Sequence, residues 1–179
     1  MDLVEFETIK NLLGLSSSSE TAYPDLAILI ESVNLAIEDE LGRSLDYKER
    51  TETVMVGTSP TRFIDLVGLP IVSVSSVLVD DEALDSDAYK ISPAGIRLAT
   101  QVREVDVVVT YTGGILTSAI PPALQRAAML QTAYEYQNKE NIGASSISTE
   151  GGSVQIPALQ LLPVVVSLIS GYKHPSRIS

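Results

Sequence analysis

The chain has 179 residues, with 12 Lys or Arg against 23 Asp or Glu, so its formal net charge is −11. A hydrophobic content of 45% is high enough for a folded core and excludes a disordered chain. The absence of cysteine excludes disulfides, thiolate catalysis and cysteine-bound metals, and no Lys/Arg cluster in the sequence favours tight nucleic-acid binding.

Helical periodicity marks the first part of the chain. Apolar residues between Leu3 and Leu13 predict a helix that stops at Gly14, and a second amphipathic helix is predicted from Pro24 to Leu41. The acidic start of the chain predicts no signal peptide. No apolar run reaches the ~20 residues that cross a bilayer, so we expect a soluble protein without a membrane partner.

The middle of the chain alternates in the manner of β-strands. Alternating valines predict a β region from about Thr51 to Thr110, with turns at Asp80-Asp81 and at Pro93-Ala-Gly95. Pro121 and Pro122 mark the start of a helix, because proline is tolerated in the first helical turn.

The last part of the chain is more polar. We expect the helix from Pro122 to end at Glu140 and a Gly/Ser/Thr loop, too polar to pack, to span residues 143–152. A short helix from Pro163 to Ser170 and an extended tail from Tyr172 complete the chain.

Together these elements predict an α+β fold in which a helical bundle packs on a small antiparallel β-meander, with mobile N- and C-terminal segments. We divide the chain into an N-terminal helix (1–15), an α+β core (21–141), and a C-terminal part (142–179) with a flexible loop, a short helix and an extended tail.

The sequence shows little catalytic chemistry, and we expect no catalytic residue, metal or cofactor. The one histidine, His174, stands beside Pro175 near the end, where a surface position is expected. Gly113-Gly114 lacks the Lys-Ser/Thr of a phosphate loop and is interpreted as ordinary turn residues. Five acidic residues form a candidate metal site that fails the EF-hand spacing and is interpreted as a solvated hairpin connection: Asp80, Asp81, Glu82, Asp85 and Asp87.

The helix from Pro122 is apolar over much of its circumference. Ala123, Ala127, Leu130 and Tyr134 form one stripe, and Met129, Ala133 and Tyr136 form a second beside it. Such a helix is covered on two sides, either by a neighbouring subunit or within its own domain. We predict subunit contacts near Ala127, Tyr134 and Tyr136.

A family resemblance is carried by the same stretch, Tyr111-Thr-Gly-Gly-Ile followed by Ile120-Pro-Pro and a helix closing in Asn-Lys-Glu140. Three further pieces agree in order: Glu40-Leu-Gly-Arg-Ser-Leu45, the segment from Leu69 to Asp81 with its following strands, and Leu161-Leu-Pro through Tyr172-Lys173. From about Thr21 to Lys173 the chain resembles the head–tail connector, or head-completion, proteins of long-tailed phages and prophages. The Ser16–Ser19 run and the stretch after Ile142 carry no signature of that family.

The resemblance implies a structural protein of the virion neck, assembled in the host cytoplasm. It implies a twelve-fold ring under the portal vertex that extends the DNA channel, without specific DNA binding, and that supports the stopper or tail. The positively charged tail, with Lys173, His174 and Arg177, is expected to dock on the portal protein. Two alternatives from other classes remain: a monomeric acidic binding or assembly module, and a small metal-dependent hydrolase around Asp80–Asp87.

Overall fold

The computed structural model describes residues 2–16, 20–139, 146–149, 152–155 and 160–174. It confirms an α+β fold with antiparallel sheets. The chain forms two compact units, each described here by itself. The β-rich unit contains residues 41–120 and 173–174, and the helical unit contains residues 2–40 together with the described part of 121–172.

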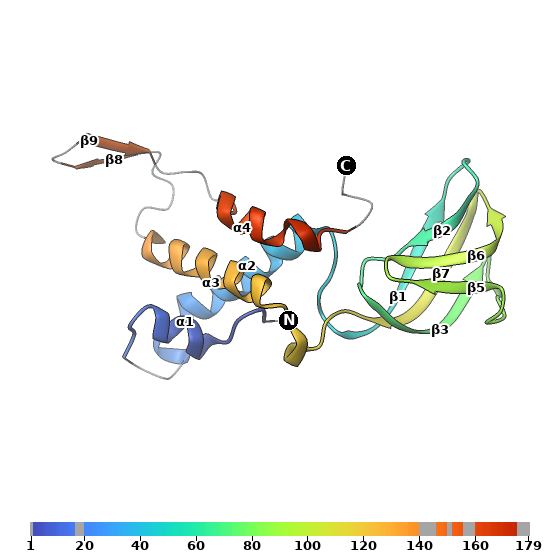
Figure 1. The fold of residues 1–179 in the computed structure, drawn as a ribbon, viewed down its shortest axis with the longest axis horizontal. Helices are drawn as coiled ribbons and strands as arrows, with labels where there is room; N and C mark the ends of the chain where they lie inside the picture. Colours follow the sequence, from blue (N-terminus) through green and yellow to red (C-terminus); the bar gives the residue numbers. More distant parts are fainter. Residues whose placement is uncertain (1, 17–19, 140–145, 150–151, 156–159, 175–179) are drawn as a thin grey trace. The chain divides into compact units, whose positions relative to one another are not determined.

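The described part of the helical unit contains four α-helices (Figure 1): α1 (Phe6–Leu12), α2 (Pro24–Leu41), α3 (Pro122–Gln137) and α4 (Pro163–Ile169). The last three each begin at a proline, as the sequence predicts. The predicted bounds of α2 are confirmed, whereas α3 ends three residues before Glu140. Among the residues that the structure describes, no helix is long and apolar enough to cross a membrane.

The buried face of α3 differs from the predicted stripes, and Gln131 and Thr132 on it are polar. Its buried residues are Leu124, Ala127, Ala128, Gln131 and Thr132. The sequence pattern missed Gln131, which is only 1% exposed. Its Nε2 donates to Glu135 Oε1 (2.7 Å) and Gln160 O (3.3 Å), and its Oε1 accepts the Leu162 N–H (2.9 Å). These bonds satisfy the buried amide and tie the segment before α4 to α3.

The β-rich unit contains two antiparallel sheets (Figure 1). In the first, the strand order is β1 (Lys48–Val56), β7 (Val105–Gly113), β3 (Ile71–Val79) and β4 (Glu82–Ala83). In the second, the order is β2 (Thr61–Asp65), β6 (Gly95–Val102) and β5 (Tyr89–Ser92). Aliphatic residues from both sheets and Tyr111 form one buried core.

Both predicted turns are confirmed. Asp80 and Asp81 connect β3 to β4 with positive φ angles of 48° and 65°, a conformation that aspartate tolerates and that tight hairpins require. Pro93 and Ala94 connect β5 to β6.

The prediction of a Gly/Ser/Thr loop over residues 143–152 is wrong where that range forms strands, and residues 143–145 and 150–151 lie outside the described residues. Ser146–Thr149 (β8) and Gly152–Gln155 (β9) pair as an antiparallel hairpin, with Thr149 opposite Gly152. The serines, threonines and glycines that indicated a loop do not prevent pairing, because backbone groups alone form the ladder of a two-stranded ribbon.

A polar network, buried at Tyr111 and Gly68 and exposed at Val67, joins β1, β7 and the loop at residues 66–70. The hydroxyl of Tyr111 donates to Glu52 Oε1 and accepts the Gly68 N–H at 2.7 Å, while Glu52 Oε2 accepts the Val67 N–H at 2.9 Å. Burial, followed by the hydrogen bond to Glu52, raises the pKa of Tyr111 above its ordinary value of 10.0.

The glycine pair after Tyr111 is more than an ordinary turn. A Cβ on Gly113 would lie 2.0 Å from Gly68 O. Gly114 has φ +110°, and a Cβ there would lie 2.3 Å from Asp46 O. Only glycine allows the backbone of the loop and of the segment before β1 to approach β7 this closely.

We expect Tyr111→Phe to lower the free energy of unfolding by about 1–3 kcal/mol, because Glu52 and the Gly68 N–H lose a buried partner. Urea unfolding measures this, with Tyr47→Phe, at a half-exposed tyrosine, as the control. The stabilisation that the raised pKa reflects is complete below about pH 10 and declines above it, because the unfolded chain then loses the phenolic proton first. The difference between wild type and Tyr111→Phe should therefore shrink above pH 10; a constant difference would contradict this account.

Candidate assembly surfaces

The three residues predicted at subunit contacts occupy different environments on α3. Ala127 is 0% exposed and belongs to the core of the single chain, so it offers no surface to a neighbour. Tyr134 and Tyr136 are partly exposed. Lys139 Nζ lies 4.4 Å from the centre of the Tyr136 ring and 4.0 Å from Asp25 Oδ2. The predicted contact surface therefore rests on the two tyrosines.

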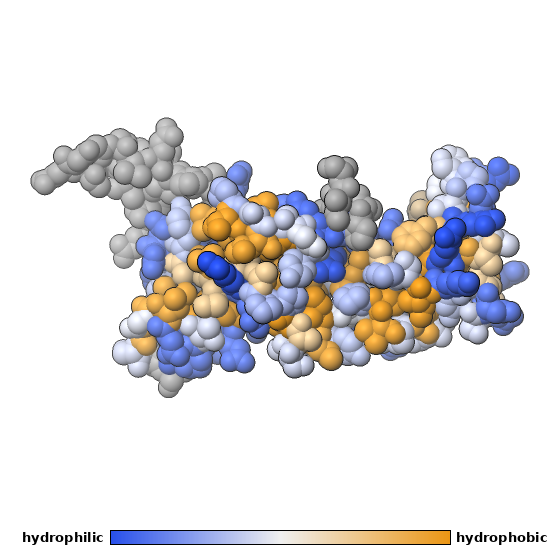
Figure 2. All heavy atoms as spheres, in the orientation of Figure 1, coloured by the Kyte–Doolittle hydropathy of each residue, from blue (hydrophilic) through white to orange (hydrophobic). Residues whose placement is uncertain are grey.

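Apolar residues also reach the surface of the helical unit, where Figure 2 shows orange areas among blue ones. Ile28 and Leu35, seven residues apart on α2, are 66% and 61% exposed. Val164 on α4 is 51% exposed, although Val165 and Ile169 of the same helix are fully buried. Single exposed aliphatic residues are normal on a protein surface, so these three add apolar area without by themselves marking a contact.

The expectation that His174 is a surface residue is wrong. His174 is 4% exposed, its Nε2 lies 3.0 Å from Leu66 O, and its backbone N–H donates to Leu41 O at 2.8 Å. The sequence around His174 contains no pattern that indicates burial, so its burial is seen only in the fold. Lys173, just before it, is partly exposed, and Arg177 lies outside the described residues.

The acidic residues of the β3–β4 region lie at turns and strand ends. In the described ranges, no group of three or more His, Asp or Glu residues is arranged to hold a metal ion. Asp80 and Asp81 form the hairpin turn, and Asp80 Oδ1 instead accepts the Asp106 N–H at 3.4 Å.

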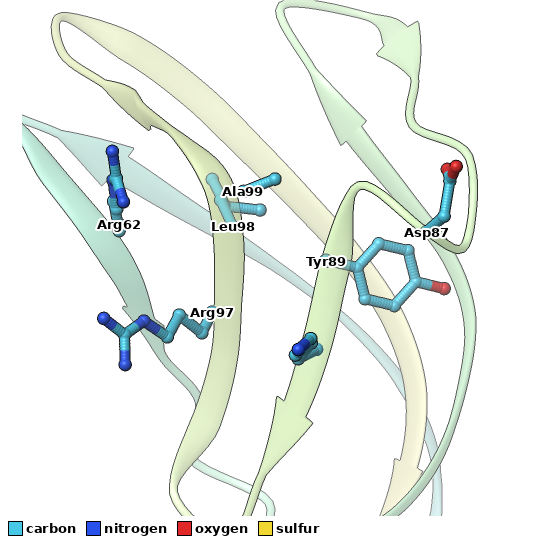
Figure 3. Close-up of a pocket in the computed structure, with 7 residues that line it drawn as sticks. Arg62, Asp87, Tyr89, Arg97, Leu98 and Ala99 are labelled. Atoms are coloured by element: carbon cyan, nitrogen blue, oxygen red, sulfur yellow. The ribbon is translucent and has the colours of Figure 1, made fainter.

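The second sheet carries a cluster of basic residues that the sequence does not reveal. Arg62, Lys90 and Arg97 line one hollow together with Asp87, Tyr89, Leu98 and Ala99. In Figure 3, Arg62 and Arg97 lie at one side of this hollow, and Tyr89 and Asp87 lie at the other. We call Arg62, Lys90 and Arg97 the basic face. They are far apart in the sequence, and three strands bring them together.

A sequence profile of the family described as head completion protein matches residues 2–174, almost the whole chain. The chain belongs to the head completion protein family. This confirms the resemblance carried by Tyr111-Thr-Gly-Gly and Ile120-Pro-Pro, and makes the chain a structural protein of a tailed-phage type of particle. No curated protein matches the chain closely enough to add to this assignment.

Solved structures support the fold of this head completion protein. It is similar to a chain in the neck of an empty gene transfer agent (GTA) particle with C6 symmetry, at a TM-score of 0.62 and 17% identity over 93% of this chain and 87% of that one. A chain in the neck of a native GTA particle with C12 symmetry gives 0.52 and 16% over 89% and 92%. A chain in the virion of a native GTA particle gives 0.57 and 16% over 88% and 79%. At such low identity the similarity shows a shared fold.

We expect His174→Ala to lower the free energy of unfolding by about 1–3 kcal/mol, because Leu66 O loses a buried partner. Chemical denaturation measures this. A chain that ends at Pro175 keeps His174 and should unfold at the wild-type denaturant concentration. Equal stability of His174→Ala and wild type would show that the imidazole of His174 contributes nothing to the stability of the fold.

Proposed function

We propose that this head completion protein is a subunit of a closed ring in the particle neck, between the portal vertex and the stopper or tail, where it extends the DNA channel. The observation that carries the proposal is the family match over residues 2–174. The similar fold of chains from GTA necks with C6 and C12 symmetry supports it and favours twelve subunits.

The protein would act by binding rather than by catalysis. A ring with rotational symmetry joins each copy to two neighbours through two different surfaces, which close when the rotation completes a circle. Tyr134 and Tyr136 are suited to one of these surfaces, because partly exposed tyrosines supply contact area at a small entropic cost. The Lys139 ammonium over the Tyr136 ring holds that side chain in place before binding.

The C-terminal segment would dock on the portal protein. His174 fixes the chain to the β-rich unit at Leu41 and Leu66, so the residues after it leave from a defined position. Lys173 and Arg177 carry positive charge on either side of this anchor in an otherwise acidic chain. Opposite charge on the portal would steer and orient the contact.

We expect Tyr136→Ala to weaken ring formation at least tenfold, because truncating an aromatic anchor at an interface typically costs 2 kcal/mol or more. Sedimentation velocity of the full chain, followed by electron microscopy of the largest species, measures this. Tyr136→Phe keeps the aromatic side chain under Lys139 and should assemble as wild type does. A wild-type chain that stays monomeric at every concentration and binds no portal would favour the monomeric acidic module instead.

We expect a chain that ends at Pro175 to bind purified portal protein more weakly than the full chain, at unchanged stability. Arg177→Glu should weaken it as well, since it reverses a charge in the docking segment. Arg126→Glu makes the same change of charge at an exposed position on α3 and serves as the control. Portal binding equal to wild type in the shortened chain would place the docking surface elsewhere.

A further inference from the structure

The basic face is set by strand register. Lys90 on β5 and Phe63 on β2 both lie opposite Arg97 on β6, so the side chains at these three positions emerge from the same face of the sheet. The register of β2 shifts between Thr61 and Phe63, and this irregularity brings Arg62 to the same hollow. All three basic side chains are exposed.

The basic face has no partner of its own in the part of the chain that the structure describes. Neither Arg62, Lys90 nor Arg97 is in an ion pair there, although Asp87 lines the same hollow. Like charges directly opposite each other on neighbouring strands, as Lys90 and Arg97 are, destabilise a sheet. An arrangement that lowers stability and forms no ion pair in the described residues fits an anionic partner outside the chain.

A complementary surface exists in the same unit. Five exposed acidic residues gather at the ends of β3, β4 and β7, which we call the acidic turns: Asp80, Asp81, Glu82, Glu104 and Asp106. The Asp80 N–H donates to Asp106 O at 3.0 Å, and the Asp106 N–H donates to Asp80 Oδ1, so the two turns are fixed together. Arg103 adds one positive charge, which leaves the acidic turns with a clear negative excess.

We propose that the basic face of one copy binds the acidic turns of the next copy of this chain, as one of the contacts that close the ring. This rests on the proposed ring function and assigns one of its contacts. The two surfaces are different, as a closing rotational contact requires. Copies with a charge of −11 repel one another. Opposite charges that meet at the contact reduce this repulsion locally and fix the position of each copy relative to its neighbour.

A second copy fits the basic face better than DNA does. Three basic residues neutralise only about three phosphates, whereas the affinity of proteins for duplex DNA grows with each phosphate neutralised. The remaining charge of the chain repels a polyanion at longer range. A few carboxylates on a rigid turn match three cations in number.

The experiment uses two full-length variants that each damage one surface. Arg97→Glu weakens the basic face and keeps the acidic turns, while Glu82→Lys weakens the acidic turns and keeps the basic face. Both residues are exposed, and Arg97→Glu replaces a like-charge pair with Lys90 by an opposite-charge pair, so neither variant should melt below wild type. Arg126→Glu, with the same change of net charge as Arg97→Glu, is the matched control.

We expect each variant alone to assemble at least tenfold more weakly than wild type in sedimentation velocity, because like charges then face each other. An equimolar mixture should recover assembly, because intact surfaces meet at one contact and, at the other, the carboxylate introduced by Arg97→Glu faces the ammonium introduced by Glu82→Lys. Raising the salt concentration from about 0.05 to 0.5 M should reduce the difference in assembly between wild type and Arg97→Glu, because exposed charges are screened.

Three outcomes would overturn the inference, and they are distinguishable. If Arg97→Glu assembles into rings as wild type and Arg126→Glu do, the ring stands and this contact is wrong. If wild type forms no oligomer at any concentration, alone or on portal, the ring proposal fails with it. If wild type shifts duplex DNA at about 0.15 M salt and Arg97→Glu does not, the basic face binds nucleic acid.

Discussion

The β-rich unit depends on the hydrogen bonds made by the loop at residues 66–70. Tyr111 and Glu52 bind its backbone N–H groups at Gly68 and Val67, and Val67 O accepts the Ser44 N–H at 2.9 Å. His174 then contacts Leu66 O from the other end of the chain. A loop with buried backbone groups must find partners for them, and here those partners come from four separate parts of the sequence. The loop therefore fixes β1, β7, the segment before β1 and the C-terminal anchor together.

This arrangement links fold to function through the C-terminal segment. His174 is the last residue that the structure describes, and it is held by a backbone and a side-chain contact. A docking peptide that begins at a fixed point searches a smaller volume than one that begins at a mobile terminus, so less entropy is lost when it binds. In the proposed docking on the portal, the buried histidine would serve as a positioning residue for the segment that follows it.

The sequence predicts some of this and not the rest, for physical reasons. The bounds of α2 follow from apolar spacing between two helix signals, Pro24 and Gly42, and the turn at Asp80-Asp81 follows from residues that tolerate positive φ. The order of the family's motifs along the chain is recognisable because each motif is a short, local stretch of sequence. Burial of His174 and Gln131 was missed, because a polar side chain is buried only where distant backbone groups satisfy it. Arg62, Lys90 and Arg97 were missed as a cluster because strand pairing, not sequence distance, joins them.

Charge sets a further constraint on assembly. Copies with a formal charge of −11 approach one another against repulsion, although screening limits it to about 8 Å at physiological salt. Apolar and aromatic contacts on the helical unit, such as those available to Tyr136, Ile28 and Leu35, favour association but give little orientation, because the hydrophobic effect is non-directional. The basic face and the acidic turns are directional. A ring needs both kinds of contact, since strong association with loose orientation would give open or irregular oligomers rather than a closed circle.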